Sequence, residues 1–378
     1  MRIFELLTGH WQPVIFYAFA AVALIQVFYY LFFFLRLALY KEKAVNNPRT
    51  HAVSVVICAR DEADNLMKNL PGVLVQHYKT THEVIVVNDN SYDESKYLLE
   101  ELQKSFRQLR VVELTQEAKM IPGKKFPLGV GIKSAKHEIL LLTDADCVPA
   151  TENWIENMQS VYNDETEIVI GYGAFHKKPG FFNKLVRWEA FHSALQYFSY
   201  ALARIPYMGV GRNLSYKRSV FFRHKGFASI NHTASGDDDL FINMAATKKN
   251  CKININPNSF TLSEGARTWK QWRKQKQRHY TTGRYYKGKH KFLLGLYSLS
   301  HFLFYPAFVA ALIFYKWEWA LAVFGCRFII QATVIYITSK RLNEKDLFPF
   351  FFIFDVWMFI YYLVFAPALF KKPAPTWK

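Results

Sequence analysis

The pattern of apolar and polar residues divides the chain into apolar ends and a mixed middle. Residues 14–35 carry no charge and are long enough to cross a bilayer as a helix. The run is too long for the core of a signal peptide, and no small-x-small cleavage site precedes the charges at Lys41, Glu42 and Lys43. We therefore expect an uncleaved membrane anchor.

Three further apolar runs near the C-terminus predict additional membrane helices, at residues 292–315, 319–339 and 347–370. The second run contains Arg327 and the third contains Asp355. In an antiparallel pair of helices these two charges would lie at similar depth. We predict a structural ion pair that locks the two helices, with a proton or substrate path as the alternative.

In the middle of the chain, short apolar runs alternate with segments of helical spacing. Strands are predicted at residues 52–59, 83–87, 109–114, 138–143 and 167–173. Helices are predicted from Glu62, at residues 93–107 with apolar positions Tyr97, Leu98 and Leu102, from Leu128, and at residues 181–204. This alternation predicts an α/β fold with a mostly parallel sheet. Aromatic residues surround the last helix, so it either packs in a core or lies at the membrane interface.

The net charge of +18 narrows the possible partners. No nucleic-acid recognition motif accompanies the basic residues, so we expect anionic lipid headgroups or phosphorylated substrates and no nucleic acid. Basic residues after the first apolar run and at residues 267–291 predict a multi-pass protein of the inner (cytoplasmic) membrane whose middle part is cytoplasmic. Lys371 and Lys372 conflict with four crossings, unless one C-terminal segment is re-entrant or the rule fails locally. The predicted domains are residues 1–45, 46–290 and 291–378.

The most informative candidate site is Asp144-Ala145-Asp146, directly after the apolar run at residues 139–143. Two carboxylates at this spacing, just past the carboxyl end of a strand, can turn toward one cation, and open α/β sheets bind ligands at that edge. Hard cations such as Mg²⁺ or Mn²⁺ bridge carboxylates to phosphates, with Asp146 as the stronger ligand and Asp144 shared. An acidic turn that closes the strand is the alternative.

Other polar clusters fall at or near strand ends, at residues 59–62, 88–89 and 236–239. A nucleotide diphosphate across this edge needs an acceptor for a base imide N–H, which Asn88 or Asp89 provides. Its phosphates need positive charge, from the cation and from Lys124 or Lys125. Solvated turns are the alternative for these lysines.

Asp237, Asp238 and Asp239 form an acidic triplet. Like charges this close raise at least one pKa, which suits a general base, although a helix N-cap would also favour Asp. Arg278, in the basic stretch before the second apolar run, is suited to bidentate phosphate binding or to a membrane-surface patch.

The order of these clusters resembles the inverting family 2 glycosyltransferases, which have a GT-A fold, over roughly residues 50–290. The matching stretches, in chain order, are Ala59-Arg60-Asp61-Glu62 (A-R-N-E), residues 86–93 (V-V-D-D-G-S-x-D), residues 123–128 (G-K-x-x-A-L), Asp144-Ala145-Asp146 with Pro149 (D-A-D and a following P), the glycine-rich residues 209–213, and residues 275–279 (Q-x-x-R-W). Asn88 replaces the first acid of the nucleotide-binding turn, and it can still accept from an imide N–H. His279 replaces the usual Trp, which weakens an assignment as a processive synthase.

The resemblance implies a role for each matched residue. Asp238 is favoured as the catalytic base over Asp237, because Gly236-Asp237-Asp238 resembles a G-E-D form. The implied metal ligands are Asp146 and Asp144, and the implied acceptor-side residues are Gly211 and Asn213. The implied donor-binding residues are Ala59, Arg60, Glu62, Asn88, Asp89, Lys124, Asp144, Gln275 and Arg278.

The implied function is transfer of a sugar from a nucleotide-diphospho-sugar, expected to be a UDP-sugar, to a hydroxyl of a membrane-associated acceptor with inversion. The acceptor would be lipid-linked or a growing glycan, in cell-envelope polysaccharide or glycolipid biosynthesis. Alternatives are a processive polysaccharide synthase, a membrane-bound nucleotidyltransferase, and a catalytically inactive scaffold of a polysaccharide export complex.

Overall fold

The computed structural model describes residues 11–42, 50–115 and 123–370. Within these residues the chain separates into two compact units. One contains residues 11–40 and 287–370, and the other contains the described residues between 41 and 286. We call them the helical unit and the α/β unit.

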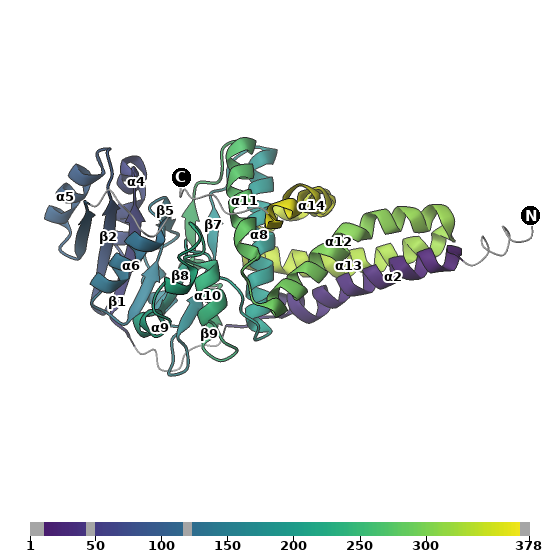
Figure 1. Ribbon diagram of the computed structural model, residues 1–378, viewed down its shortest axis with the longest axis horizontal. Coiled ribbons are helices and arrows are strands. Elements are labelled where there is room, and N and C mark those ends of the chain that lie inside the picture. Colours follow the sequence, from purple (N-terminus) through teal and green to yellow (C-terminus); the bar gives the residue numbers. More distant parts are fainter. Residues whose placement is uncertain (1–10, 43–49, 116–122, 371–378) are drawn as a thin grey trace, which may run out of the picture. The chain divides into compact units, whose positions relative to one another are not determined.

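The α/β unit is built on a seven-stranded sheet with the order β3-β2-β1-β4-β8-β6-β9 (Figure 1). Its strands are β1 (Val53–Ala59), β2 (His82–Asp89), β3 (Leu109–Leu114), β4 (Ile139–Leu142), β6 (Ile168–Ile170), β8 (Leu214–Lys217) and β9 (Cys251–Ile253). Neighbouring strands are parallel except where β8 pairs with β4 and β6. The carboxyl ends of β1, β2 and β4 therefore meet at one edge, as the predicted parallel sheet requires.

Helices cover both faces of the parallel part of the sheet. Every residue of β1 is buried, which explains why its sequence is apolar apart from Ser54. Core residues from α4 (Ala63–Leu74), α5 (Ser95–Ser105) and α7 (Trp154–Gln159) pack with Val53, Val55 and Ile57. α6 (Lys125–Ser134) packs on β1 and β2 through Gly131, where an added Cβ would lie 2.6 Å from Val56.

The helix predicted at residues 93–107 is confirmed as α5, and the strand predicted at residues 167–173 is wrong. Tyr97 is 68% exposed and does not face the core; Leu99 on α5 is the fully buried position. The apolar run at residues 167–173 is not one strand, because the chain leaves the large sheet after β6 and enters a second sheet at β7 (Gly173–Phe175). This second sheet has the order β5-β10-β7 and includes β5 (Cys147–Pro149) and β10 (Thr261–Ser263).

Two long helices of the α/β unit are joined by a buried ion pair. α8 (Phe181–Leu202) carries Glu189, whose carboxylate pairs with the ammonium of Lys276 on α11 (Trp269–Gly283). The aromatic side chains predicted to surround α8 are buried, namely Trp188, Phe191, Tyr197, Phe198 and Tyr200. This burial favours the core alternative for the helix.

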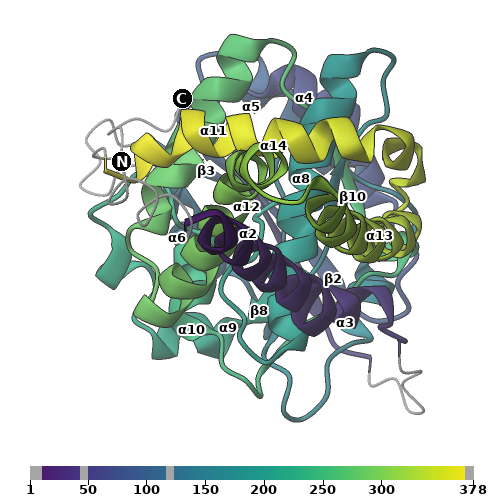
Figure 2. The same ribbon diagram turned by 90° about the vertical axis from the view of Figure 1, so that its right-hand side faces the viewer.

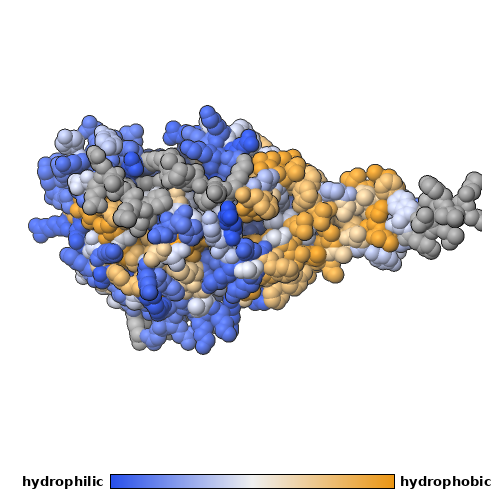
Figure 3. Space-filling view, viewed as in Figure 1, coloured by the Kyte–Doolittle hydropathy of each residue, from blue (hydrophilic) through white to orange (hydrophobic). Residues whose placement is uncertain are grey.

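The helical unit contains four helical segments that are long and apolar enough to cross a membrane. The first runs through α2 (Trp11–Phe28), the π-helical turn η1 (Tyr29–Phe34) and α3 (Leu35–Ala38). The others are α12 (Gly288–Phe314), α13 (Trp317–Arg341), and α14 (Phe351–Phe365) with the 3₁₀ turns η4 (Lys345–Phe350) and η5 (Ala366–Phe370). Hydrophobic side chains gather over α12 and α2 on the face seen in Figure 3. In Figure 2, α2, α12 and α13 are seen nearly end-on, whereas α14 runs across them.

The predicted ion pair between Arg327 and Asp355 is confirmed. Arg327 Nη1 donates to Asp355 Oδ2 at 2.6 Å, and both side chains are almost fully buried. Tyr305 and Gln331 also donate to the Asp355 carboxylate, each at 2.5 Å. The pair joins α13 to a helix that crosses it, and not to an antiparallel neighbour as predicted.

Candidate active site

The acid pair lies where β4 of the large sheet leads into β5 of the small one. Asp144 and Asp146 are both partly exposed, while Ala145 between them is buried. Ligand atoms of Asp144, Asp146 and Cys147 lie within 4.8 Å of one another. The Cys147 thiol donates to Asp146 Oδ1 at 3.4 Å, and burial raises its pKa well above the ordinary value. The protonated thiol is a poor ligand for a hard cation, so the two carboxylates are the candidate metal ligands.

The two carboxylates differ in their electrostatic surroundings. Burial acts to raise the pKa of Asp144, but the Lys124 ammonium, which forms an ion pair with it, and the charges of Arg212 and Arg278 together hold this pKa below its usual range. Asp146 lacks such an ion pair among the described residues. Burial and the nearby charge of Asp144 raise its pKa to about 6. A cation beside Asp146 would relieve this repulsion, so the donor set fits a hard divalent metal ion.

Asn88 and Asp89 are the last residues of β2, and both are buried. Asn88 Nδ2 donates to Glu113 Oε2 at 2.8 Å, which leaves its carbonyl oxygen as the other polar atom of the side chain. This buried Oδ1 has no hydrogen-bond partner within the described ranges. An orphaned buried acceptor is costly and calls for an explanation such as a ligand donor.

The loops that follow β1 and β2 are bonded to each other. The Asp61 backbone N–H donates to Ser91 Oγ at 2.9 Å, and Asp61 Oδ1 accepts from the Tyr92 backbone at 2.8 Å. Asp61 and Asn90 have φ of 52° and 51°, which Asp and Asn tolerate better than other non-glycine residues. Asn90, where the family pattern has glycine, thus adopts a left-handed conformation that glycine takes readily.

The three remaining residues of the first cluster flank this junction. Ala59 ends β1 and is buried, Arg60 is partly exposed, and the Glu62 backbone N–H donates to Ser95 Oγ at 3.3 Å. These residues lie at the same edge of the sheet as Asn88 and the acid pair, as predicted from the strand ends.

Asp238 is the N-cap of α10 (Asp239–Ala245) and is also held by the glycine-rich loop. Its Oδ1 accepts from the Asp239 backbone at 2.7 Å, and its Oδ2 accepts from the Gly211 backbone at 2.8 Å. Burial, together with the charges of Asp237 and Asp239, raises the pKa of Asp238 to about 7. Helix capping and a raised pKa therefore occur in the same residue.

The other two acids of the triplet have different surroundings. Asp239 Oδ2 accepts from Thr282 Oγ1 at 2.5 Å and from Tyr286 Oη at 2.8 Å, so this buried carboxylate ties α10 to the end of α11. Asp237 is partly exposed, and its charge acts on the Lys124 ammonium. Lys124 therefore lies under the influence of both the acid pair and the triplet.

The basic helix α11 reaches the same region. Arg278 Nη1 donates to Ser235 Oγ at 3.3 Å, just before the acidic triplet, and its charge lowers the pKa of Asp144. Gln275 lies one turn earlier on α11 and is partly buried, whereas His279 is exposed.

Two residues of the glycine-rich loop, residues 209–213, differ from what the sequence indicated. The surroundings of Asn213 do not fit its predicted role, and Arg212 was not singled out at all. Asn213 is fully buried. Its amide donates to the carbonyls of Tyr172 and Ser259, and its Oδ1 accepts from Trp154 Nε1. The side chain therefore stabilises the loop from inside the core and does not face an acceptor. Arg212 was missed, yet its charge acts on both Asp144 and Asp146. Its guanidinium lies 4.1 Å over the Phe175 ring and donates to Ser263 Oγ at 3.0 Å. Only the pairing of β7 with β10 could have placed Arg212 there.

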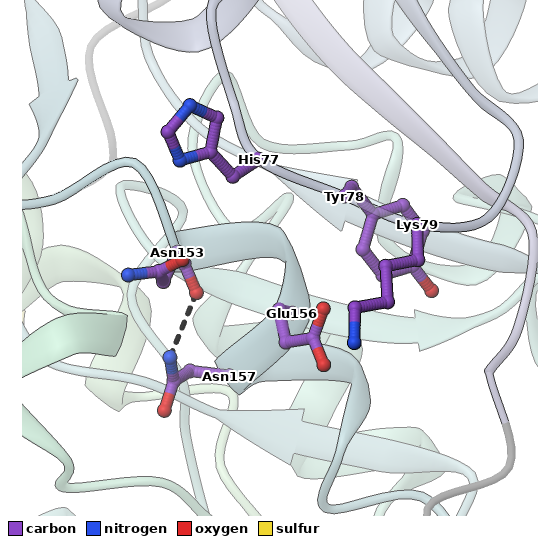
Figure 4. Close-up of a pocket in the computed structure, with 6 residues that line it drawn as sticks. All are labelled: His77, Tyr78, Lys79, Asn153, Glu156 and Asn157. Carbon is purple, nitrogen blue, oxygen red and sulfur yellow. Dashed lines mark hydrogen bonds between the residues drawn. The ribbon is translucent and has the colours of Figure 1, made fainter.

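A pocket of about 470 Å³ lies elsewhere on the α/β unit, lined by His77, Tyr78, Lys79, Asn153, Glu156 and Asn157 (Figure 4). These residues precede β2 or begin α7, away from the strand ends that carry the acid clusters. None of the predicted site residues lines it.

Comparison with known proteins gives the class of this unit. Residues 54–235 match the model of the family described as Glycosyl transferase family 2. The chain is 23% identical over 297 residues to the "Probable glycosyltransferase YdaM" of Bacillus subtilis, which covers 76% of this chain and 66% of that protein. It is 26% identical over 140 residues to "Glycosyltransferase AglE" of Haloferax volcanii, which covers 37% of this chain and 44% of that protein. The matches thus span about two thirds or less of these relatives.

A solved structure is similar over nearly the whole chain. It is the mannosyltransferase PcManGT of Pyrobaculum calidifontis, in complex with GDP-Man and Mn²⁺, at 16% identity and a TM-score of 0.55 over 92% of this chain and 99% of that one. The predicted GT-A fold is thereby confirmed. Residues 54–235 belong to a family 2 glycosyltransferase domain, and the chain carries candidate membrane helices on both sides of it.

Proposed function

We propose that this protein transfers a sugar from a nucleotide-diphospho-sugar to a hydroxyl group of a membrane-associated acceptor, with inversion at the anomeric carbon. The observation that carries the proposal is the position of Lys124. Its ammonium pairs with Asp144 and lies within the electrostatic reach of Asp237, so the candidate donor and acceptor groups belong to one site.

On the donor side, Asn88 Oδ1 offers an unused buried acceptor to the imide N–H of uracil, which supports a UDP-sugar. Lys124, Arg278 and Arg212 place positive charge around Asp144, where a diphosphate would lie. Asp146, with Asp144, would hold a divalent cation, Mg²⁺ or Mn²⁺. Such an ion, when bound, stabilises the negative charge of the departing nucleotide diphosphate.

On the acceptor side, Asp238 is suited to remove the proton from the attacking hydroxyl. The raised pKa of its carboxyl, about 7, makes it a stronger base than an ordinary Asp, and the ionised form that accepts the proton dominates above that pH. The hydroxyl oxygen then forms the new glycosidic bond as the bond from the anomeric carbon to the diphosphate breaks. A single displacement of this kind inverts the anomeric centre.

The function is tested with membranes that contain the protein and a panel of UDP- and GDP-sugars, scored by nucleotide-diphosphate release. Release with a UDP-sugar supports the proposal, and NMR of the product reports the anomeric configuration. Release of pyrophosphate with formation of a nucleotide-sugar would instead indicate a nucleotidyltransferase. Absence of any turnover across the panel would favour the scaffold alternative.

For the membrane region we propose three crossings, by the first segment, α12 and α13, with α14 as a re-entrant segment that packs across α12 and α13 without spanning the bilayer. Arg341 Nε donates to the Ala38 carbonyl at 2.7 Å, so the ends of the first and third crossings meet at one face, beside the basic residues Arg36 and Lys340. An α14 that runs across the other helices, as in Figure 2, would not be a fourth crossing, which removes the conflict between four crossings and the charges of Lys371 and Lys372. These two lysines lie outside the described residues. A reporter fused to the C-terminus that is active only in the periplasm would contradict this topology.

A further inference from the structure

The second lysine of Gly123-Lys124-Lys125 has surroundings unlike those of the first. Lys125 begins α6 and is 1% exposed. Its Nζ donates to the carbonyls of Ile230, Thr233 and Ser235 at 2.7, 2.7 and 2.6 Å, and to Thr233 Oγ1 at 2.9 Å. Four acceptors therefore surround an ammonium that has three N–H groups, and all of them come from one loop.

This loop, residues 230–236, leads directly into the acidic triplet. The Thr233 hydroxyl, which accepts from Lys125, also donates to the Ser235 carbonyl. Gly123 packs so closely on the loop that an added Cβ would lie 2.0 Å from the Ala234 carbonyl oxygen. On the other side, Arg278 donates to Ser235 Oγ. The loop is thus held from α6 and from α11 immediately before Asp237.

The charge of Lys125 also matters to the triplet. Asp237, Asp238 and Asp239 are the ionised groups whose charges act on Lys125, and all three favour its protonated form. Desolvation works against them and lowers the lysine pKa to about 8. A buried cation is unfavourable unless hydrogen bonds and opposite charges compensate for its lost hydration. Here three carbonyls accept from the ammonium, and its charge offsets those of the acids.

We propose that Lys125 is a positioning residue for the base: by gathering the carbonyls of residues 230–235 it fixes the direction in which the chain enters α10, and so orients Asp237 and Asp238 toward the acceptor hydroxyl. The inference rests on the proposed function. It separates the two adjacent lysines, with Lys124 acting on the donor side and Lys125 on the acceptor side.

The test compares Lys125→Met, Lys125→Arg and the exposed control Lys133→Met on the same helix, in the full-length protein in detergent. In Lys125→Met we expect kcat to fall about 100-fold, as for a small misplacement of a catalytic group, while UDP affinity stays within about twofold. The acid limb of its pH–kcat profile moves to higher pH, because loss of the cation makes Asp238 harder to ionise. Lys125→Arg keeps the charge but cannot point three N–H groups at these acceptors, so its kcat falls about 10-fold with an unshifted acid limb.

Thr233→Val serves as a second variant if Lys125→Met does not fold; it is nearly isosteric and should reproduce the kcat loss at about 3- to 10-fold, again without loss of UDP affinity. Wild-type kcat in the Lys125 variants would overturn the inference. So would a parallel loss of UDP affinity and folded protein, which a purely structural role predicts.

A readout without turnover separates this inference from the proposed function. Hydrogen exchange of the amides at residues 230–240 should be at least about 10-fold faster in Lys125→Met than in wild type and Lys133→Met. If wild type releases no nucleotide diphosphate, the proposed function fails, and this comparison still decides whether Lys125 holds the loop. Unchanged exchange there overturns the inference by itself.

Discussion

The backbone N–H of Gly211 donates to Asp238 Oδ2 at 2.8 Å, so the glycine-rich loop directly holds the candidate catalytic base. The other oxygen of Asp238 caps α10. Because both oxygens accept backbone hydrogen bonds, the carboxylate is held in one orientation. A general base needs a fixed orientation, since it must lie within hydrogen-bond distance of the acceptor hydroxyl.

Replacing Asp238 by Asn keeps the cap acceptor but removes the base. We expect kcat to fall by about 10²- to 10⁴-fold with little change in UDP affinity. Asp237→Asn is the matched variant and should cost less, unless Asp237 is the base. Product formation measured at saturating donor decides between them: a larger loss in Asp237→Asn would reassign the role.

The activity should depend on pH through Asp238. Its pKa is raised to about 7, and only the deprotonated form can accept a proton. We therefore expect kcat/KM to fall as the pH drops below about 7 and to level off above it. Asp61 is an exposed acid outside the triplet, so the pH profile of kcat/KM for Asp61→Asn should coincide with that of wild type. A limb near pH 4 would mean that an unperturbed carboxylate is the base.

Metal dependence should reside mainly in Asp146. EDTA should abolish transfer, and Mn²⁺ or Mg²⁺ should restore it. Asp146→Asn should lower activity at least about 100-fold at low metal concentration, and a high metal concentration should restore part of the activity. Loss of a direct metal ligand should cost at least as much as the roughly 10- to 100-fold loss seen when residues behind the ligands are changed. Metal-independent transfer by Asp146→Ala would refute this role. Glu113→Gln, at an exposed position of β3 beside Asn88, is the control with an unchanged metal titration.

Asn88 should contribute to nucleotide affinity through its unused carbonyl. Asn88→Leu removes one hydrogen bond to the base and should weaken UDP binding about 10-fold. Calorimetric titration with UDP and GDP checks this, with the exposed Asn153→Leu as the control. Equal affinity of Asn88→Leu and wild type for UDP would place the base elsewhere.

The buried ion pair between Arg327 and Asp355 should matter for stability and not for chemistry. Arg327→Ala or Asp355→Ala leaves a buried charge without its partner and should cost about 3 to 5 kcal/mol of unfolding free energy. The exchange Arg327→Asp with Asp355→Arg should restore part of this, because Tyr305 and Gln331 donate to position 355 and suit only a carboxylate fully. Thermal unfolding in detergent measures the effect, with the exposed Glu318→Gln on α13 as control. No recovery at all in the exchanged pair would count against a structural lock.

The pattern of apolar residues was sufficient to predict the strands in the parallel half of the sheet. β1, β2, β3 and β4 lie within two residues of their predicted bounds, because buried parallel strands are read directly from short apolar runs. The pattern was not sufficient for residues 167–173, because it does not show that the chain leaves one sheet and enters the other within this stretch. Helical spacing alone also did not show which apolar residues of α5 are buried: Tyr97 is exposed, and Leu99 is the fully buried residue.

The sequence by itself determined the α/β class, the apolar helices and the acid pair Asp144-Ala145-Asp146, because each depends on residues that are neighbours in the chain. The tertiary structure alone decided which lysine faces which acid, that Asn213 points into the core, and that Arg212 lies beside the acid pair. These depend on interactions between segments that are distant in the chain, such as Lys124 with Asp237 and Lys125 with Ser235. Adjacent residues in a helix or loop point in different directions, so their partners follow from the packing of the segments and not from spacing.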